Sequence, residues 1–292
     1  CLYSYKNIWC RDRQLVQRKD KMMKKDKKVL VASHRGYFGG NIIENTLPAF
    51  EAAIRAGADI VETDIHITKD DVMILFHDPS PLRLLGLPGR VEDYTLEELQ
   101  SRSLLNVIGQ PSGYKINTLE EMLTAFKGRC MINLDQCWNF IDRVYDVVEE
   151  YGMEEQALIK GRVPYDSVVE WIRKRRWKPM FIPIITCDEE IDQFYSLPKE
   201  LNIPQVEVFV TNDNDKVISE PFVKELEERN IRLWVNALTL GGNTDMSAHH
   251  DDDVSVTKSP EEGWGWLIKH GARVIQTDWP SELNRYLNTL EG

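Results

Sequence analysis

Two carboxylates and an imidazole alternate with apolar residues in one short stretch of the sequence. The stretch Ile60 to Ile67 is rich in β-branched residues and holds neither Gly nor Pro, so it favours an extended strand. Side chains two positions apart point to the same side of a strand, which puts Glu62, Asp64 and His66 on one face. Unpaired buried charges are costly, so two carboxylates on such a face need a cation or a dense set of hydrogen-bond donors. The pattern predicts a charged site at the end of a strand.

A second extended run follows and ends on another pair of titratable residues. The turn-forming residues 69–71 (Lys-Asp-Asp) separate the strand from the apolar run Val72 to Phe76, which leads into His77 and Asp78. A hairpin of this kind brings the carboxylates and an imidazole together by local geometry. The alternative, a surface hairpin with solvated charges, is disfavoured because its flanks are too apolar for an exposed ribbon.

A partner for this hairpin lies upstream. Val29 to Ala32 is a short apolar run of the kind found in buried strands; His-Arg-Gly follows at 34–36 and Glu-Asn-Thr at 44–46. In order, His-Arg-Gly, Glu-Asn-Thr, Glu-x-Asp, Thr-x-Asp and His-Asp resemble the motifs of the glycerophosphodiester phosphodiesterase family. The combination is far more specific than any one motif alone. The motifs cover residues 29–78, and the rest of the chain resembles the family in its rhythm of strands and helices.

The resemblance implies that the protein hydrolyses a small-molecule glycerophosphodiester to sn-glycerol 3-phosphate and an alcohol, with His34 and His77 as the two catalytic histidines. An imidazole can both deprotonate an attacking oxygen and protonate a leaving alkoxide near neutral pH. A lone histidine is more often structural. Two histidines at the ends of consecutive strands, beside a carboxylate cluster, favour catalysis.

A metal site is expected next to the histidines. Glu62, Asp64 and Asp135, which ends a later apolar run, offer only oxygen ligands, and such ligands favour one hard divalent cation, Ca²⁺ or Mg²⁺. The family pattern at this third strand is Glu-x-Lys, whereas this chain has Asp135-Gln136-Cys137. The carboxylate is kept and the lysine is lost. The alternative role for Asp135 is a helix N-cap before Trp138.

Three residues are expected to contact the substrate. Lys160 ends the next strand, and we predict that it replaces the lost lysine at the phosphate; the alternative is an ordinary exposed lysine. Arg35 can hold a phosphate oxygen as a two-pronged donor. Trp234 is expected to line the substrate pocket.

Two further residues are expected to support the site. Glu44 is predicted to orient Arg35 or His34, or to touch the metal. Asn45 or Thr46 is a good N-cap for the helix that begins near Leu47, and Asn45 is expected to take this role.

The fold class follows from eight short apolar runs that alternate with helical patterns. This alternation predicts an α/β fold, a (β/α)₈ TIM-type barrel over residues 29–292, with an inserted excursion at 79–117 after the second strand. The catalytic face of such a barrel is formed by the carboxyl ends of its strands. The predicted strands are Val29–Ser33, Ile60–Ile67, Cys130–Asp135, Ala157–Lys160, Met180–Ile185, Val206–Val210, Ile231–Asn236 and Val274–Thr277.

One histidine-rich cluster falls outside this scheme. Residues 249–253 (His-His-Asp-Asp-Asp) lie in a polar stretch after the seventh strand, and we predict a solvated loop there instead of a metal site. Trp264 and Trp266 are predicted to pack a helix against the barrel.

Composition excludes some classes of partner and leaves the compartment open. The net charge of −11 argues against nucleic acid, and no apolar run is long enough to span a bilayer. Residues 1–28 are basic and are predicted to be a mobile extension. An odd number of widely spaced cysteines, 5, suggests reduced thiols and a cytoplasmic protein. A chain that begins at Cys1 instead of Met has two interpretations: a fragment whose natural start lies near Met22 or Met23, which we favour, or a membrane-tethered lipoprotein processed at Cys1.

Two rival functions remain. One is a lysophospholipase D or a sphingomyelinase D-like phospholipase on the same barrel. The other is a barrel that binds phosphodiesters without cleaving them. The sequence leaves the oligomeric state open.

Overall fold

The computed structural model of this chain describes residues 27–240 and 244–290. The predicted basic extension at 1–28 lies outside the described residues, except for its last two positions. Among the described residues no helix is both long enough and apolar enough to cross a membrane.

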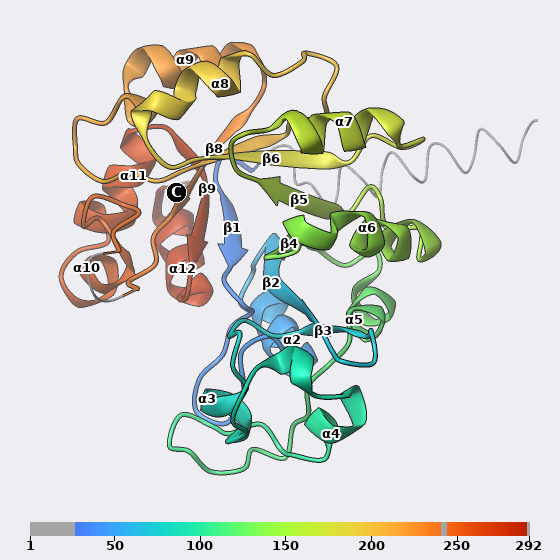
Figure 1. Cartoon of the computed structure of the whole chain (residues 1–292). Coiled ribbons are helices and arrows are strands. Elements are labelled where there is room, and N and C mark those ends of the chain that lie inside the picture. The colour runs from blue at the N-terminus through green and yellow to red at the C-terminus, as the bar shows by residue number, and fades with distance from the viewer. Residues whose placement is uncertain (1–26, 241–243, 291–292) are drawn as a thin grey trace, which may run out of the picture.

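The strands close into a barrel (Figure 1). Eight of them run parallel in the order β1-β9-β8-β7-β6-β5-β4-β2, and the pairing of β1 with β2, in which Ala32 lies opposite Ile60, closes the ring. The short β3 adds to β2 in antiparallel register, as the hairpin prediction required. The barrel prediction is confirmed. The strands of the described chain are β1 Leu30–Ser33, β2 Ile60–Ile67, β3 Met73–Leu75, β4 Met131–Asp135, β5 Ala157–Gly161, β6 Met180–Ile185, β7 Gln205–Val208, β8 Arg232–Asn236 and β9 Ala272–Thr277.

Helices lie between most successive barrel strands and cover them. The α-helices are α2 Leu47–Arg55, α3 Leu82–Leu85, α4 Leu96–Gln100, α5 Leu119–Phe126, α6 Ile141–Glu150, α7 Asp166–Lys174, α8 Ile191–Tyr195, α9 Glu220–Glu228, α10 Asp252–Thr257, α11 Trp266–Lys269 and α12 Pro280–Leu290. The 3₁₀ turns are η1 Val91–Asp93, η2 Trp138–Phe140, η3 Asp188–Glu190 and η4 Lys216–Ile218, and η5 Glu261–Gly265 is a π-helical turn. The one helix predicted to carry Trp264 and Trp266 is thus divided into η5 and α11.

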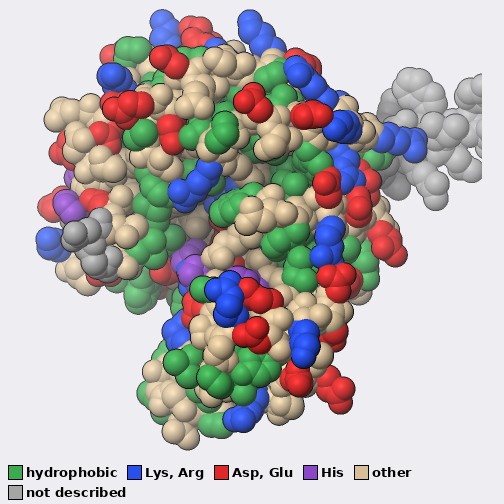
Figure 2. All heavy atoms as spheres, viewed as in Figure 1, with side chains coloured by type: hydrophobic (Ala, Val, Ile, Leu, Met, Phe, Trp, Pro, Cys, Tyr) green, Lys and Arg blue, Asp and Glu red, His purple; other side chains and the backbone are tan. Residues whose placement is uncertain are grey.

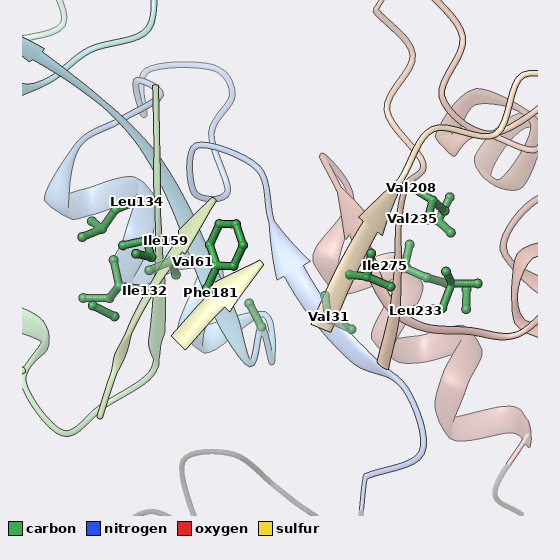
Figure 3. Packing of buried hydrophobic residues seen from close by; sticks show 14 of the residues in the cluster. Val31, Val61, Ile132, Leu134, Ile159, Phe181, Val208, Leu233, Val235 and Ile275 are labelled. Atoms are coloured by element: carbon green, nitrogen blue, oxygen red, sulfur yellow. The ribbon is translucent and has the colours of Figure 1, made fainter. Parts of the chain in front are cut away.

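Alternation along the strands produces two apolar layers. Side chains that point outward, among them Val31, Val61, Ile132 and Ile275, pack under the helices and form the main core (Figure 3). The inward-pointing side chains fill the barrel itself with a smaller cluster of Leu30, Ala32, Ile60, Met131, Leu158, Met180, Ile182, Trp234 and Val274. The barrel is therefore filled with side chains, and the site must lie at one of its ends.

The cap of α2 is the second of the two predicted candidates. The Thr46 side chain, not that of Asn45, accepts a hydrogen bond from the backbone N–H of Ala49. Pro48 lies in the first turn, where no intrahelical N–H partner is lost. Asn45 is therefore free of capping, and its side chain points into the site.

The excursion after β2 folds as a lobe that lies below the barrel in Figure 1. It carries α3, η1 and α4 and has an apolar cluster of its own, formed by Ile43, Ile74, Phe76, Leu84, Leu85, Val91, Leu99, Leu104 and Ile116. Because Ile74 and Phe76 belong to this cluster, the lobe fixes the segment that carries His77.

Candidate active site

The polar residues of the site continue the inward-pointing rows of the barrel interior. On β2 the row runs from Ile60 to Glu62 and Asp64, and on β5 it runs from Leu158 to Lys160. The same alternation places further polar residues on the inner face: Asn133 and Asp135 on β4, Glu207 on β7, Asn236 on β8 and Gln276 on β9. The carboxyl ends of the strands therefore bring a polar layer together above an apolar one.

Glu62 and Asp64 are buried side by side with Asp135. In the parallel register of β2 and β4, Asp64 lies opposite Asp135. Only 1% of Glu62 and 3% of Asp64 is exposed. Loss of solvation, together with the charges of Asp64 and Asp135, raises the pKa of Glu62 well above its usual value. Loss of solvation also raises the pKa of Asp64, although the charges of His77 and Arg35 oppose this rise.

Lys160 supplies the main counter-charge within the barrel. Its Nζ lies 3.1 Å from Asp135 Oδ2 and 2.5 Å from Glu207 Oε2, and 5.0 Å from the centre of the Trp234 ring. Burial alone would lower the pKa of Lys160, but Asp135, Glu207 and Glu62 raise it. The reciprocal effect lowers the pKa of Asp135 despite its loss of solvation. Lys160 is therefore not an exposed surface lysine, and it stays charged beside the site.

Arg35 joins the carboxylates from the other side. Its backbone N–H donates to Glu62 Oε2 at 2.8 Å, its Nη1 donates to Glu44 Oε1 at 3.0 Å, and its Nε lies 3.4 Å from Asp64 Oδ2. Glu44 also accepts from Nη1 and Nη2 of Arg83, both at 2.7 Å. Burial would raise the pKa of Glu44, but Arg83 and Arg35 together lower it. Glu44 thus orients Arg35, which is one of the roles predicted for it.

Asn45 holds a carboxylate instead of capping a helix, which corrects its predicted role. Its Nδ2 donates to Asp64 Oδ2 at 3.0 Å, and its Oδ1 accepts from the Thr63 hydroxyl at 2.7 Å and from the Asp64 backbone N–H at 3.2 Å. Capping was predicted because Asn and Thr are both good N-caps. The next residue, Thr46, takes that place, so Asn45 is free to fix the rotamer of Asp64.

Each predicted catalytic histidine is held by a carboxylate. His34 Nδ1 lies 2.8 Å from Asp278 Oδ1, and His77 Nδ1 lies 2.8 Å from Asp78 Oδ1. Asp78 in turn accepts from Arg83 Nε at 2.6 Å. The backbone N–H of Phe76 donates to the Asp64 carbonyl, so His77 directly follows a residue paired with the carboxylate strand. Figure 2 shows histidine and basic side chains together at the hollow between the lobe and the barrel.

The residue types suit a hard cation, but their side chains are not arranged as a formed metal site. In the described ranges, no group of three or more His, Cys, Asp or Glu side chains could hold a metal ion. Asp64 accepts from Gln136 Nε2 at 3.0 Å, and Lys160 pairs with Asp135. However, the donors are all oxygens, the charges of Asp64 and Asp135 raise the pKa of Glu62, and the buried Asn133 amide opposite Glu62 has no hydrogen-bond partner among the described residues. A divalent cation stays a prediction.

Two predicted positions are enclosed by the fold. Cys137, which replaces the family lysine, is 1% exposed, and its thiol packs in the main core, away from the barrel interior. Trp234 is fully buried in the barrel, and its Nε1 donates to Asn236. A substrate-binding role for Trp234 stays a prediction, and in this structure it would act through Lys160, above its ring.

Left-handed backbone occurs at three non-glycine site residues. The φ angles of Arg35, Asn45 and Gln136 are 52°, 54° and 56°. Non-glycine residues are strained there, on the order of 1–3 kcal/mol each, so the surrounding structure must hold them. Here the strain lets Arg35 direct its own N–H at Glu62, and lets Asn45 and Gln136 direct their side chains at Asp64.

Several of these residues were missed by the sequence reasoning. Glu207 follows from the alternation rule, because it lies on the inner face of a strand that was predicted nearly at its observed bounds. Gln136 and Arg83 gave no signal, since both act through long side chains on irregular backbone. Asp278 directly follows the last predicted strand, but no role was assigned to it from the sequence.

The site combines imidazoles and carboxylates at the strand ends of a parallel barrel, an arrangement that suits a hydrolase. Comparison with known proteins identifies the family. The sequence model described as "Glycerophosphoryl diester phosphodiesterase family" matches residues 34–236. The human protein named Lysophospholipase D GDPD1 is 33% identical over 278 residues, which cover 89% of this chain and 86% of that protein. The chain therefore belongs to the glycerophosphoryl diester phosphodiesterase family.

Two further comparisons show how far the similarity extends in sequence and in structure. A Bacillus altitudinis protein named glycerophosphodiester phosphodiesterase is 33% identical over 140 residues, which span 45% of this chain and only 57% of that relative. The crystal structure of a glycerophosphoryl diester phosphodiesterase from Parabacteroides distasonis superposes with a TM-score of 0.74 at 23% identity, covering 93% of this chain and 92% of that one. This structural likeness establishes the shared barrel fold.

The raised pKa of Glu62 predicts a pH-dependent stability. A carboxyl whose pKa is higher in the folded than in the unfolded chain stabilises the fold below its unfolded pKa, and this contribution is lost as pH rises through the folded pKa. In chelator, the free energy of unfolding of the wild type should therefore fall as pH rises from about 4.5. Glu62→Gln should weaken this slope and be the more stable protein at pH 7. Urea titrations at several pH values measure both, and equal slopes would contradict the role given to Glu62.

Proposed function

We propose that the protein hydrolyses glycerophosphodiesters to sn-glycerol 3-phosphate and an alcohol, with His34 and His77 as proton carriers and one divalent cation as cofactor. The observation that carries this proposal is the matched pair of imidazoles. Each is held through Nδ1 by a carboxylate, at 2.8 Å, beside the buried Glu62 and Asp64. Holding Nδ1 leaves Nε2 of each ring for the substrate, and fixes which nitrogen exchanges protons.

The two rings divide the proton transfers between them. One imidazole takes a proton at Nε2 from the attacking oxygen, which belongs to water or to a neighbouring hydroxyl of the substrate. The other protonates the alkoxide as the P–O bond breaks. Asp278 and Asp78 stabilise whichever ring is protonated, because each places a carboxylate against Nδ1.

Positive charge at the site supports binding and reaction of a phosphodiester. A divalent cation held by Glu62, Asp64 and Asp135 would stabilise negative charge on the phosphoryl oxygens. Arg35 and Lys160 border the same carboxylates and can donate to the phosphate, but both are already ion-paired in this structure. When substrate binds, a phosphate oxygen would therefore replace one carboxylate partner of Arg35 or Lys160.

A lysophospholipase D activity is the second candidate, and a specific cavity favours it. A cavity of about 580 Å³ beside Asp278 is lined by Tyr37, Phe38, Ile42 and Trp279. Such an apolar lining suits a hydrocarbon chain next to the histidine held by Asp278. The similarity to a human protein named lysophospholipase D also supports this candidate. Faster release of choline from lysophosphatidylcholine than from glycerophosphocholine would select it.

The first test measures release of glycerol 3-phosphate from glycerophosphodiesters with several head groups, with chelator and with added Ca²⁺ or Mg²⁺. We expect activity only with a divalent cation. Asp64→Asn should lose activity because a charged carboxylate ligand becomes a neutral amide. The cation should raise the Tm of the wild type more than that of Asp64→Asn, a readout that is independent of turnover.

The control is Asp70→Asn, which changes a carboxylate in the exposed turn after β2. It should respond to the cation as the wild type does. Full activity of exhaustively chelated wild type would exclude the metal, whereas no release from any head group would exclude the proposed function.

The second test separates the histidines. His34→Ala and His77→Ala should each lose about 100-fold or more in kcat, the usual scale for general acid–base catalysis. The double variant should lose less than the product of the two losses, because both rings act in one step. The variant that lacks the acid should recover on a nitrophenyl ester, whose leaving group needs no proton. Near-normal turnover of His77→Ala on an alkyl phosphodiester would exclude His77 as a proton carrier.

The third test concerns Lys160. Lys160→Met keeps the length of the side chain but removes its charge, and kcat/KM should fall on the order of 100-fold if Lys160 contacts the phosphate. The Tm should also fall, because Asp135 and Glu207 lose their cation. Glu207→Gln is the matched control, since it disturbs the same ion pair without removing the cation. Unchanged kinetics in Lys160→Met would show that the phosphate is bound without Lys160.

A further inference from the structure

The first residue of α10, Asp252, is buried beneath the active-site face. Only 1% of Asp252 is exposed, so the solvated loop predicted over residues 249–253 is wrong for this residue. Asp251 takes the role of helix cap, because its side chain accepts from the Val254 backbone N–H. The Asp252 backbone N–H donates to the Ala237 carbonyl at 2.7 Å, so the residue is fixed against the end of β8.

Three donors from two elements converge on the Asp252 carboxyl group. Trp264 Nε1 donates to Oδ1 at 2.8 Å and the Thr277 hydroxyl donates to Oδ1 at 2.7 Å. The backbone N–H of Asp278 donates to Oδ2 at 2.8 Å. Trp264 reaches the carboxyl from the π-helical turn η5, while Thr277 and Asp278 come from the end of β9.

This cluster connects directly to a proposed proton carrier. Asp278, whose N–H is held by Asp252, places its own Oδ1 2.8 Å from His34 Nδ1. One unbroken series of hydrogen bonds therefore runs from Trp264 through Asp252 and Asp278 to His34. Loss of solvation raises the pKa of Asp252 to about 8, so a carboxyl group is kept here against a burial cost. The His34 ring can hold its angle only if the backbone that carries the Asp278 carboxylate is itself fixed.

We propose that Asp252 is a positioning residue for His34: it fixes the backbone of Asp278, and through it the carboxylate that orients the imidazole. This proposal rests on the proposed function, in which His34 transfers a proton. Asp252 acts on the turnover step and not on substrate binding, because it lies behind Asp278, on the side away from the barrel interior.

The decisive variant is Asp252→Asn. The new amide can keep its oxygen towards Trp264 and Thr277, but its NH₂ group then faces the Asp278 N–H, donor against donor. We expect kcat for glycerol 3-phosphate release to fall on the order of 10-fold, the scale seen when an outer hydrogen-bond partner of a functional group is lost, with KM little changed. Trp264→Phe is the matched control. It removes the indole donor on the side of Asp252 away from Asp278, so it should lower Tm while keeping kcat near the wild-type value.

A double-mutant cycle separates positioning from general destabilisation. If Asp252 acts through Asp278, Asp252→Asn should cost little further kcat in an Asp278→Asn background. Full additivity of the two losses would overturn the proposal. If Asp252→Asn does not fold, Asp252→Ser avoids the clash of donors, still leaves the Asp278 N–H without its carboxylate, and should give the same kinetic result.

A measurement without turnover distinguishes this proposal from the proposed function. The ¹⁵N shifts of the His34 ring, assigned by comparison with His34→Gln, report the tautomer and the hydrogen bond at Nδ1. Asp252→Asn should shift these resonances, and Trp264→Phe should leave them near their wild-type positions. Unchanged His34 resonances in Asp252→Asn would overturn the positioning role even in an active enzyme. An inactive wild type whose His34 resonances respond to Asp252→Asn would refute the proposed function alone.

Discussion

Burying Glu62, Asp64 and Glu207 inside one barrel places three carboxylates where water does not screen their repulsion. Lys160 and Arg35 oppose this charge from two sides, and the remaining lone pairs are taken up by amide and backbone donors such as Asn45. Even so, the pKa of Glu62 stays raised. Negative charge at the site thus exceeds positive charge. This excess favours binding of a further cation and makes the positive charges of Lys160 and Arg35 hard to replace.

Residues on regular strands were predictable because one local rule governs them. Alternation along β2 places Glu62 and Asp64 on the inner face whatever the rest of the chain does, and the same rule holds for Lys160 on β5. The barrel followed equally well from the eight apolar runs. The rule ends where the strand ends. Gln136 has a left-handed backbone directly after β4, so the direction of Cys137 could not be deduced by counting residues.

Residues that act across long stretches of sequence were not predictable from local pattern. Asn45 and Thr46 are both good helix caps by type, and only the distant strand β2 decides that Asn45 serves Asp64. Asp252 lies in a run of polar residues that reads as solvated, and its burial depends on Trp264 and Thr277, 12 and 25 positions away. In each case the deciding partner comes from tertiary packing, which composition and spacing do not encode.

The contact between His34 and Asp278 joins residues that are 244 positions apart. His34 directly follows β1 and Asp278 directly follows β9, the first and last barrel strands in chain order. During synthesis, Asp278 therefore emerges from the ribosome only after all eight parallel strands of the described barrel. Closing so long a loop is slow and becomes favourable only when the other strands are already paired. The geometry proposed for catalysis therefore depends on closure of the barrel, and a chain cut before β9 would carry every predicted metal ligand and both histidines without the carboxylate that holds His34.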